Sequence, residues 1–416
     1  MREMNYLEKL LDGAEVAWLP LGDVTQYEQP TKYLVAAKNY SDEYETPVLT
    51  AGKTFILGYT DEVEGIYKAS ESPVIIFDDF TTANKWVDFD FKVKSSAMKM
   101  ITSSDEDKVF LKYIYYWLNT LPSELVDGDH KRQWIGTFTE KRIPIPCPEN
   151  PKKSLAIQAE IVRILDAFTE LTAELTAELT TELTARKKQY KHYRDQLLSF
   201  EDGEVEWKTL PEMALDFGRG KSKHRPRNDE RLYGGDVPFI QTGDIRNASH
   251  TITEYSQTYS EIGLMQSKLW PKGTLCITIA ANIAETSILG FDACFPDSVI
   301  GFMADPQKTS SGYVEYLLQS FKTKLEEKGR EKSSAQSNIN LGTFEQLKLP
   351  FPPLAEQTRI VAILDKFDAL TNSLTEGLPR EIELRQQQYE HYRDLLLSFP
   401  KAATKTTLSP VEEQHG

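Results

Sequence analysis

Apolar residues recur every three or four positions along two long stretches of the chain, which is the spacing of one helix face. The first stretch, residues 154–200, contains neither glycine nor proline, and its apolar stripe is formed by Ile161, Leu165, Phe168, Leu171, Leu175, Leu179, Leu183, Tyr190, Tyr193 and Leu197. At about 1.5 Å per residue, it predicts a helix roughly 70 Å long. The second stretch, residues 354–399, contains Gly377-Leu378-Pro379, which predicts a kink or a break.

The first stretch repeats a four-residue phrase in the sequence LTAELTAELTTELTAR, residues 171–186. Each step of four turns an ideal helix by about 400°, so the row of leucines drifts by about 40° per repeat. An apolar stripe on so long a helix needs a partner, and the second long helix can provide it. Because a globular segment separates the two stretches, we predict that they pair as an antiparallel coiled coil.

Three motifs of the chain occur twice. The pairs are IVRILDAF (161–168) with IVAILDKF (360–367), QYKHYRDQLLSF (189–200) with QYEHYRDLLLSF (388–399), and IGTFTEKRIPIP (135–146) with LGTFEQLKLPFP (341–352). The first two pairs share an offset of 199 residues (360 − 161 and 388 − 189). The sequence therefore predicts an internal duplication with pseudo-twofold symmetry, in which a globular module and then a long helix are written twice.

The globular modules combine short strands with one aromatic-rich helix each, which predicts a mixed α/β fold. In the first module the expected strands are TPVLTAG (46–52), SPVIIFDDF (72–80) and SSAMKMIT (95–102), followed by a helix over 111–121. In the second they are VPFIQTGDI (237–245), GTLCITIA (273–280) and SVIGFMAD (298–305), followed by a helix over 313–324. The fold class is thus α+β, with two mixed modules and two long helices.

Composition limits the class of protein. The 416 residues predict about two to four domains, and a hydrophobic content of 40% is enough for real cores. No segment approaches the ~18 apolar residues of a membrane span, so we expect a cytoplasmic protein without a membrane partner. The net charge of −15 argues against a surface covered with nucleic-acid-binding groups, so contact with DNA requires local basic patches.

Cysteines and histidines offer no clear metal site. Cys147, Cys276 and Cys294 are too few and too scattered for a disulfide framework or a zinc site, and we expect buried thiols. His192 and His391 occupy equivalent positions of the two long helices, which favours a structural role.

The TAEL phrase, the helix beginning FPPLAEQTRIVAILDKF and the IPIP motif that ends the first module carry a family resemblance. Up to about Phe399 the chain resembles the specificity subunit of a type I restriction-modification system, of the IC kind. The resemblance implies two target recognition domains, each of which reads one half of a bipartite site in double-stranded DNA. It also implies that the long helices separate these domains and dock two methylase subunits, to which restriction subunits are added in the full complex.

The resemblance implies that this chain itself holds no cofactor, while the partner subunits use S-adenosylmethionine, ATP and Mg²⁺. The expected segments are a first recognition domain (1–152), a spacer helix with the TAEL repeats (153–200), a second recognition domain (201–352), a second spacer helix (353–400) and a disordered tail (401–416).

Catalytic motifs are missing from the sequence. It contains no NPP[FY] motif of adenine methylases and no HExxH, and the GRGKS segment has Leu215 where a Walker A motif needs glycine. A self-sufficient methyltransferase or nuclease is therefore disfavoured. A coiled-coil scaffold with two protein-binding heads remains the alternative, and it predicts no basic loops at equivalent ends of the modules.

The second module carries the strongest basic segment, GRGKSKHRPRNDER (218–231), with six Arg/Lys and two acids. We expect this loop to bind phosphates and some base edges. Polar side chains of QT at 241–242 and QSN at 336–338 are able to reach bases as well. The DNA-binding candidates in this module are Arg219, Lys221, Lys223, His224, Arg225, Arg227, Gln241, Thr242, Gln336, Ser337 and Asn338.

In the first module the matching basic stretch is GDHKRQW (128–134), and TTANKW (81–86) adds polar side chains. Lys53 gives weaker support, since the position equivalent to it in the second module is Asp244. The candidates for DNA binding in the first module are Asn84, Lys85, His130, Lys131, Arg132 and Gln133. The adjacent Asp78 and Asp79 are expected to form a strand-end turn rather than an acid/base pair.

Overall fold

A computed structural model describes residues 6–36, 40–52, 54–122, 132–201, 203–223, 226, 229–279, 284–331, 340–372 and 377–400. The chain divides into two compact units, residues 1–175 with 385–416, and residues 176–384. We call the globular part of the first unit, which precedes the long helix α4 (Pro151–Leu197), the first module. The globular part of the second unit, between α4 and α9 (Leu354–Asn372), is the second module.

The first module has antiparallel and mixed sheets with short helices. Its helices are α1 (Tyr6–Leu11), α2 (Leu21–Val24) and α3 (Leu111–Leu118), with helical turns η1 (Pro30–Tyr33) and η2 (Trp134–Phe138). Its strands are β1 (Val16–Pro20), β2 (Thr25–Glu28), β3 (Thr46–Leu49), β4 (Ile56–Thr60), β5 (Val74–Asp78), β6 (Asn84–Val87), β7 (Lys92–Val93), β8 (Met98–Ser103) and β9 (Arg142–Pro146). The sheets have the orders β2-β8-β5-β6, β4-β3-β7 and β1-β9.

Alternation along the central strands builds two cores on the two faces of the first module's main sheet. Ile75 and Phe77 of β5 belong to the core that also contains Ile114 of α3. Val74 and Ile76 belong to the core on the other face. Because side chains of a strand point alternately to opposite faces, one short apolar run supplies both cores. The strands predicted over 46–52, 72–80 and 95–102, and the helix over 111–121, are confirmed as shorter elements, although β8 ends one residue later than predicted.

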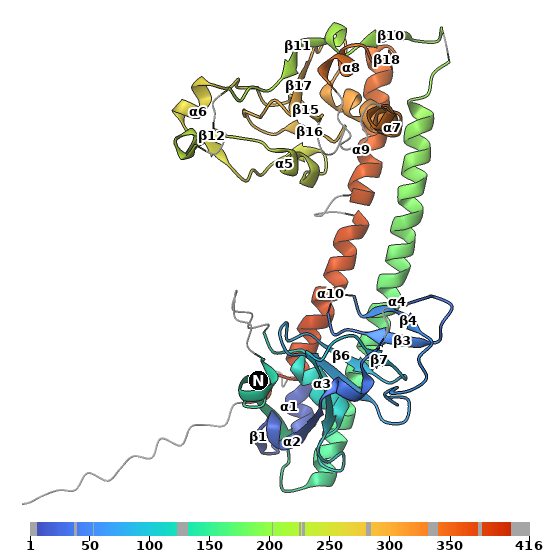
Figure 1. Ribbon diagram of the computed structural model, residues 1–416, viewed down its shortest axis with the longest axis vertical. Coiled ribbons are helices and arrows are strands. Elements are labelled where there is room, and N and C mark those ends of the chain that lie inside the picture. The colour runs from blue at the N-terminus through green and yellow to red at the C-terminus, as the bar shows by residue number, and fades with distance from the viewer. Residues whose placement is uncertain are drawn as a thin grey trace, which may run out of the picture. The chain divides into compact units, whose positions relative to one another are not determined.

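The second module has the same plan with added elements. Its helices are α5 (Thr242–Asn247), α6 (Glu261–Met265), α7 (Ser311–Glu331) and α8 (Leu341–Glu345), with turns η3 (Pro211–Met213) and η4 (Glu230–Leu232). Its strands are β10 (Glu206–Thr209), β11 (Ala214–Arg219), β12 (Tyr233–Pro238), β13 (Thr251–Ile252), β14 (Thr258–Tyr259), β15 (Leu275–Thr278), β16 (Thr286–Leu289), β17 (Val299–Ala304) and β18 (Lys348–Phe351). The main sheet has the order β11-β17-β15-β16-β13, and α7 packs between it and α9 (Figure 1).

One prediction for the second module is wrong in part. The stretch 237–245, expected as a strand, contains only the end of β12, and α5 begins at Thr242. Gln241 stands at the N-cap of α5 instead of at a strand end. Its side chain and that of Asp244 form a reciprocal capping box, which satisfies free backbone N–H groups of the first helical turn.

The long helices follow the sequence pattern. Helix α4 is unbroken, whereas its twin is divided into α9 and α10 (Gly377–Leu396), as the Gly-Leu-Pro sequence predicts. Gly377 has a φ of 74°, and a Cβ atom there would lie 2.6 Å from the carbonyl oxygen of Leu370. A side chain at this position would be strained and would clash with the backbone, so the start of α10 requires glycine.

Within each unit, α4 packs against a segment of its twin that runs in the opposite direction, as predicted (Figure 1). In the first unit Phe168 stacks on Tyr392, and the Thr169 hydroxyl lies 3.1 Å from the Tyr389 hydroxyl. In the second unit α4 meets α9, where Tyr193 stacks on Phe367. Stacked aromatic side chains therefore form part of both helix contacts.

The duplication extends to single hydrogen bonds. The hydroxyl of Tyr113 donates to the carbonyl oxygen of Pro144 (2.7 Å), and that of Tyr313 donates to Pro350 (3.1 Å). These bonds fasten the aromatic helix of each module to the strand that leads into a long helix. The internal duplication predicted from repeated motifs is thus confirmed at the level of contacts.

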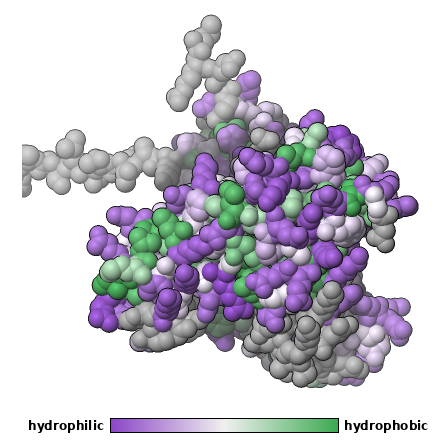
Figure 2. Space-filling model, turned by 90° about the horizontal axis from the view of Figure 1, so that it is seen from above, coloured by the Kyte–Doolittle hydropathy of each residue, from purple (hydrophilic) through white to green (hydrophobic). Residues whose placement is uncertain are grey.

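Among the described residues, no helix is long and apolar enough to cross a membrane. The visible surface is mostly hydrophilic, with small separate hydrophobic patches (Figure 2). Cys147, Cys276 and Cys294 are free and buried, as the sequence predicts.

Candidate nucleic-acid interface

Two of the predicted DNA-binding residues, Asn84 and Lys85, begin β6 directly after the turn that joins it to β5. Asp78 closes this turn, since its Oδ1 accepts hydrogen bonds from the N–H groups of Phe80 (2.9 Å) and Thr81 (2.8 Å), which confirms the expected strand-end turn. Lys85 is exposed on β6. Asn84 is half-buried, and its Oδ1 accepts a hydrogen bond from the amide of Asn119 (3.2 Å) at the end of α3.

Arg132 and Gln133 are brought to the same end of the first module. The N–H of Gln133 donates to the carbonyl oxygen of Asp79 (2.8 Å), and Asp79 directly follows β5. Arg132 is exposed and Gln133 is half-buried. The structure therefore joins the polar residues of 84–85 and 132–133, which are far apart in the sequence, at one edge of the sheet. His130, Lys131 and Lys53 lie outside the described residues.

The basic segment of the second module leaves the end of β11. Arg219, Lys221 and Lys223 have exposed side chains at alternate positions. Gly220 between them is buried, and a Cβ atom there would lie 2.2 Å from the carbonyl oxygen of Phe295. This close approach holds the backbone against the module, so that the three cations extend into solvent. His224, Arg225 and Arg227 lie outside the described residues.

Gln241 and Thr242 lie near this segment, because both the residue before them and Gly220 contact the stretch Cys294-Phe295. The N–H of Ile240 donates to the carbonyl oxygen of Cys294 (2.8 Å), next to the Phe295 that contacts Gly220. The amide of Gln241 donates to Oε1 of Gln257 (2.7 Å). A base edge would therefore have to compete with the existing partners of Gln241.

Two lysines close to the candidate residues were missed in the sequence, Lys268 in the second module and Lys99 in the first. Lys268 lies with its Nζ 2.6 Å from Oδ2 of Asp216 and 3.5 Å from the ring centroid of Trp270. The neighbouring Ser267 hydroxyl donates to the carbonyl oxygen of Lys221 (2.8 Å). Lys99 of the first module is fully buried against Asp79. The only sequence signal for a special role of Lys99 is that a charged residue stands at a position where the strand pattern places side chains in the core.

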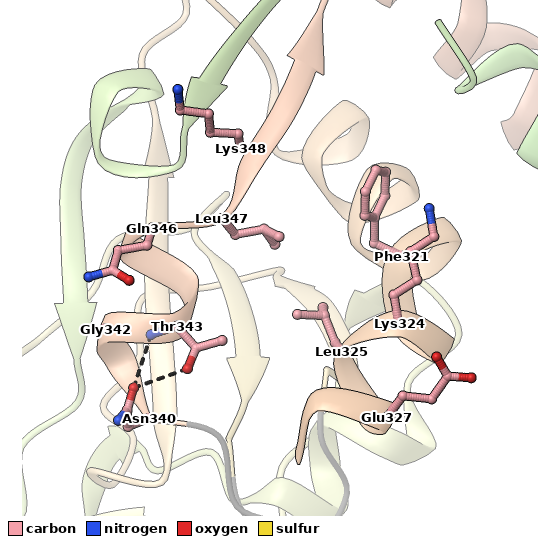
Figure 3. A pocket seen from close by; sticks show the side chains of 10 residues that line it. All are labelled: Phe321, Lys324, Leu325, Glu327, Asn340, Gly342, Thr343, Gln346, Leu347 and Lys348. Atoms are coloured by element: carbon pink, nitrogen blue, oxygen red, sulfur yellow. Dashed lines mark hydrogen bonds between the residues drawn. The ribbon is translucent and has the colours of Figure 1, made fainter. Parts of the chain in front are cut away.

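A pocket of about 920 Å³ lies between α7, α8 and β18 in the second module (Figure 3). Leu325 and Leu347 line facing sides of it, and Asn340 caps α8 by accepting hydrogen bonds from the N–H (3.0 Å) and the hydroxyl (3.1 Å) of Thr343. The candidates Gln336, Ser337 and Asn338 belong to the segment between α7 and α8 and lie outside the described residues.

A titratable pair of the half-buried His250 and the buried Glu315 also lies in the second module, on the side of α9. His250 Nδ1 lies 2.5 Å from Oε2 of Glu315. Burial raises the pKa of Glu315 to about 7, and the hydrogen bond to Glu315 raises the pKa of His250. Asp365 and Asp368 of α9 add negative potential. Among the described residues, no group of three or more His, Cys, Asp or Glu side chains is placed to hold a metal ion.

Comparisons with known proteins match both units. A family model described as "Type I restriction modification DNA specificity domain" matches residues 15–185 and again 205–384. The specificity subunit of an Escherichia coli type I restriction enzyme is 55% identical over 418 aligned residues, covering 97% of this chain and 99% of that protein. A putative type I specificity subunit of Haemophilus influenzae is 31% identical over 95% of this chain and 98% of its own length.

One solved structure shares the fold. It is a chain from a study of complex assembly and conformational transition of the type I R-M system, with a TM-score of 0.62 and 16% sequence identity. The match covers 92% of this chain and 97% of that one. At this identity the likeness concerns the fold alone.

Proposed function

Because the chain belongs to the family of type I restriction-modification DNA specificity subunits, we propose that it reads a bipartite DNA site, one half with each module. The observation that carries this proposal is the duplicated module with exposed basic and polar residues at its sheet ends. Arg132 and Lys85 stand at this place in the first module, and Arg219, Lys221 and Lys223 in the second. Phosphates attract such cations, and amide groups are suited to base edges.

The specificity subunit is non-catalytic, and we assign the chemistry to its partners. We propose that two methylase subunits dock on the long helices and use S-adenosylmethionine to methylate adenine. Restriction subunits would add ATP- and Mg²⁺-dependent cleavage. The place of action is the cytoplasm. We further propose that the recognition domains end near residues 152 and 352, where α4 and α9 begin.

The proposed contacts reconcile a net charge of −15 with binding to DNA. Local cations at the sheet ends approach the phosphates, because a basic patch can attract DNA within a chain that is acidic as a whole. The six cations of residues 218–231 are the strongest such group. A scaffold that binds only proteins has no need of these cations, and the family membership does not favour it.

An exchange of modules tests the proposal. Residues 208–350 are replaced by the corresponding region of a relative, and the assembled complex is expressed in cells whose methylated sites are then sequenced. We expect one half of the site to change and the other half to stay. A change in both halves, or in neither, contradicts separate reading by the two modules.

A further inference from the structure

The first module contains a fully buried ion pair beside the sheet end that carries Lys85 and Arg132. The Nζ of Lys99 on β8 lies 2.9 Å from Oδ2 of Asp79, and neither side chain is exposed. Lys99 also donates to Oε1 of Gln29 (3.1 Å) and lies 5.8 Å from the ring centroid of Tyr27. Taking two charges out of water is unfavourable, so this pair requires a reason.

Asp79 connects the sheet to the segment that carries Arg132 and Gln133. Its Oδ1 accepts a hydrogen bond from the N–H of Trp134 (2.9 Å), and its carbonyl oxygen accepts one from the N–H of Gln133 (2.8 Å). Lys99 holds the other carboxylate oxygen, so the position of Asp79 is fixed from two sides. Arg132 extends into solvent directly before these two anchored residues.

The second module builds the same place without charge. The N–H of Asp79 donates to Ala97 (3.0 Å), and the N–H of Ile279 donates to Ser298 (3.1 Å), so these positions correspond. Two residues beyond Ala97 stands Lys99, and two beyond Ser298 stands Ile300. Ile279 and Ile300 belong to one apolar core.

The following turn is also held differently in the two modules. Trp134-Ile135-Gly136-Thr137-Phe138 corresponds to Asn340-Leu341-Gly342-Thr343-Phe344. In the second module Asn340 caps the turn with its own side chain. In the first, a buried tryptophan takes that place, its ring 5.0 Å from that of Phe77, and the acceptor comes from Asp79.

The second module forms the same fold with two isoleucines here, so the fold as such does not require a buried ion pair. We propose that Asp79, held by Lys99, is a positioning residue that sets the backbone of Arg132 and Gln133 for reading the first half-site. This inference rests on the proposed function. A buried pair that can be replaced by apolar residues without loss of the fold is suited to such a role in specificity.

Two double variants in the assembled complex with its methylase subunits separate positioning from packing. Asp79→Ile/Lys99→Ile introduces the two isoleucines of the second module and removes the acceptor for the N–H of Trp134. Asp79→Asn/Lys99→Met removes both charges but keeps a side-chain oxygen that can accept this bond. Ile279→Val/Ile300→Val is the matched control in the second module.

The measurement is the ratio of DNA affinities for the wild-type site and for sites with one base pair changed in either half. The sites are first defined by sequencing methylated DNA, and the module exchange shows which half belongs to the first module. We expect the Ile/Ile variant to lose about tenfold of its discrimination in the first half-site and none in the second. The Asn/Met variant and the control are expected to keep wild-type ratios.

The outcomes are distinct. Wild-type ratios in the Ile/Ile variant, equal losses in both half-sites, or equal losses in the two double variants at Asp79 overturn the inference. Failure of the Ile/Ile variant to assemble assigns the pair to the fold and overturns it too. A wild-type complex that discriminates in neither half contradicts the proposed function itself, before any variant is compared.

Discussion

The ring of Phe168 on α4 stacks on that of Tyr392 on α10, with centroids 5.5 Å apart and planes at 19°. The residues 199 positions away in each direction, Phe367 and Tyr193, repeat this contact at 5.8 Å and 27° (367 − 168 and 392 − 193). In the first contact the phenylalanine lies on α4 and the tyrosine on the twin helix, and in the second contact this assignment is reversed. The duplication has kept the geometry of the helix contact together with its sequence.

The tyrosine bonds between modules and long helices offer a matched pair of stability tests. The hydroxyl of Tyr116 donates to Oδ1 of Asp166 (2.5 Å), and that of Tyr316 donates to Oδ1 of Asp365 (2.7 Å). Each Tyr→Phe change removes a bond to a charged acceptor, and we expect it to lower the free energy of unfolding by about 1–3 kcal/mol. The loss should be smaller at Tyr116, because Asp166 also pairs with Lys112 (3.0 Å).

Urea unfolding monitored by circular dichroism measures both changes. Tyr255→Phe is the control, since Tyr255 is 46% exposed and no such loss is expected there. Values for Tyr116→Phe and Tyr316→Phe equal to that of the control would show that these bonds do not stabilise the modules.

The basic segment of the second module predicts a change in the salt dependence of DNA binding. Lys221→Ala and Lys223→Ala each remove one exposed cation. If each contacts a phosphate, the slope of log affinity against log salt should become shallower by about one unit per change. Binding is measured with the assembled complex at several salt concentrations.

Lys208→Ala is the control for removal of a lysine. Lys208 lies on β10, before the start of β11, and pairs with Glu206 (3.3 Å). We expect the wild-type slope for this variant. An unchanged slope for Lys221→Ala and Lys223→Ala would identify the segment as a solvated surface.

The TAEL repeats predict a change in the spacing of the two half-sites. Each four-residue repeat adds ~6 Å to the helix and about 40° of rotation, while one base pair adds ~3.4 Å and about 36°. Deleting 176–179 from α4 should therefore leave both half-sites unchanged and shorten the spacer between them by about one base pair. The excess length has to be taken up by tilt of the helices or by bending of DNA.

Sequencing of methylated DNA from cells with the deletion tests this ruler. A spacer of unchanged length would indicate that the repeats are merely tolerated in a solvated helix. Deletion of a single residue is the control, because it rotates the apolar stripe by ~100° and should abolish assembly.

The pair of His250 and Glu315 predicts that the second unit loses stability as the pH rises through neutrality. Both pKa values are raised on folding, that of Glu315 to about 7 by burial and that of His250 by its hydrogen bond to Glu315. Glu315 then stabilises fully below about pH 4.5 and loses this contribution as the pH rises through 7. The stabilising contribution of His250 is complete below about pH 6.5 and is lost as the pH rises through its raised pKa. Both groups therefore lower the free energy of unfolding as the pH increases.

Unfolding by urea between pH 6 and 8 measures this slope, which is at most about 1.4 kcal/mol per pH unit for each proton. Glu315→Gln should flatten it. Glu285→Gln, at an ion pair with Lys322 in the same module, is the control and should keep the wild-type slope. A flat slope in the wild type would contradict the prediction.

Local periodicity predicted the long helices, the break near Gly377 and the central strands of both modules. It failed at Gln241, where the prediction was a strand and the structure has the N-cap of α5. The capping box with Asp244 favours the helix, and it depends on polar side chains, which the apolar pattern does not include. The strand pattern of 95–102 also did not predict Asp79 as the partner of Lys99, because their contact depends on the pairing of β5 with β8.

The candidate DNA-binding residues were chosen by charge and by loop composition. This choice found exposed cations such as Arg132 and Lys221. It did not find Lys268, which reaches the same module end only through the fold of the chain between α6 and β15. Residues that hold others in place carry little signal in composition, because their role depends on contacts between distant segments.

The three buried cysteines report separately on the two units. Cys147 lies in the first unit, and Cys276 and Cys294 lie in the second. Burial blocks access to each sulfur and raises the pKa of each thiol, so alkylating reagents reach a cysteine only after its own unit opens. The order in which labelled peptides appear in mass spectra, as denaturant is increased, therefore gives the order in which the halves of the chain unfold.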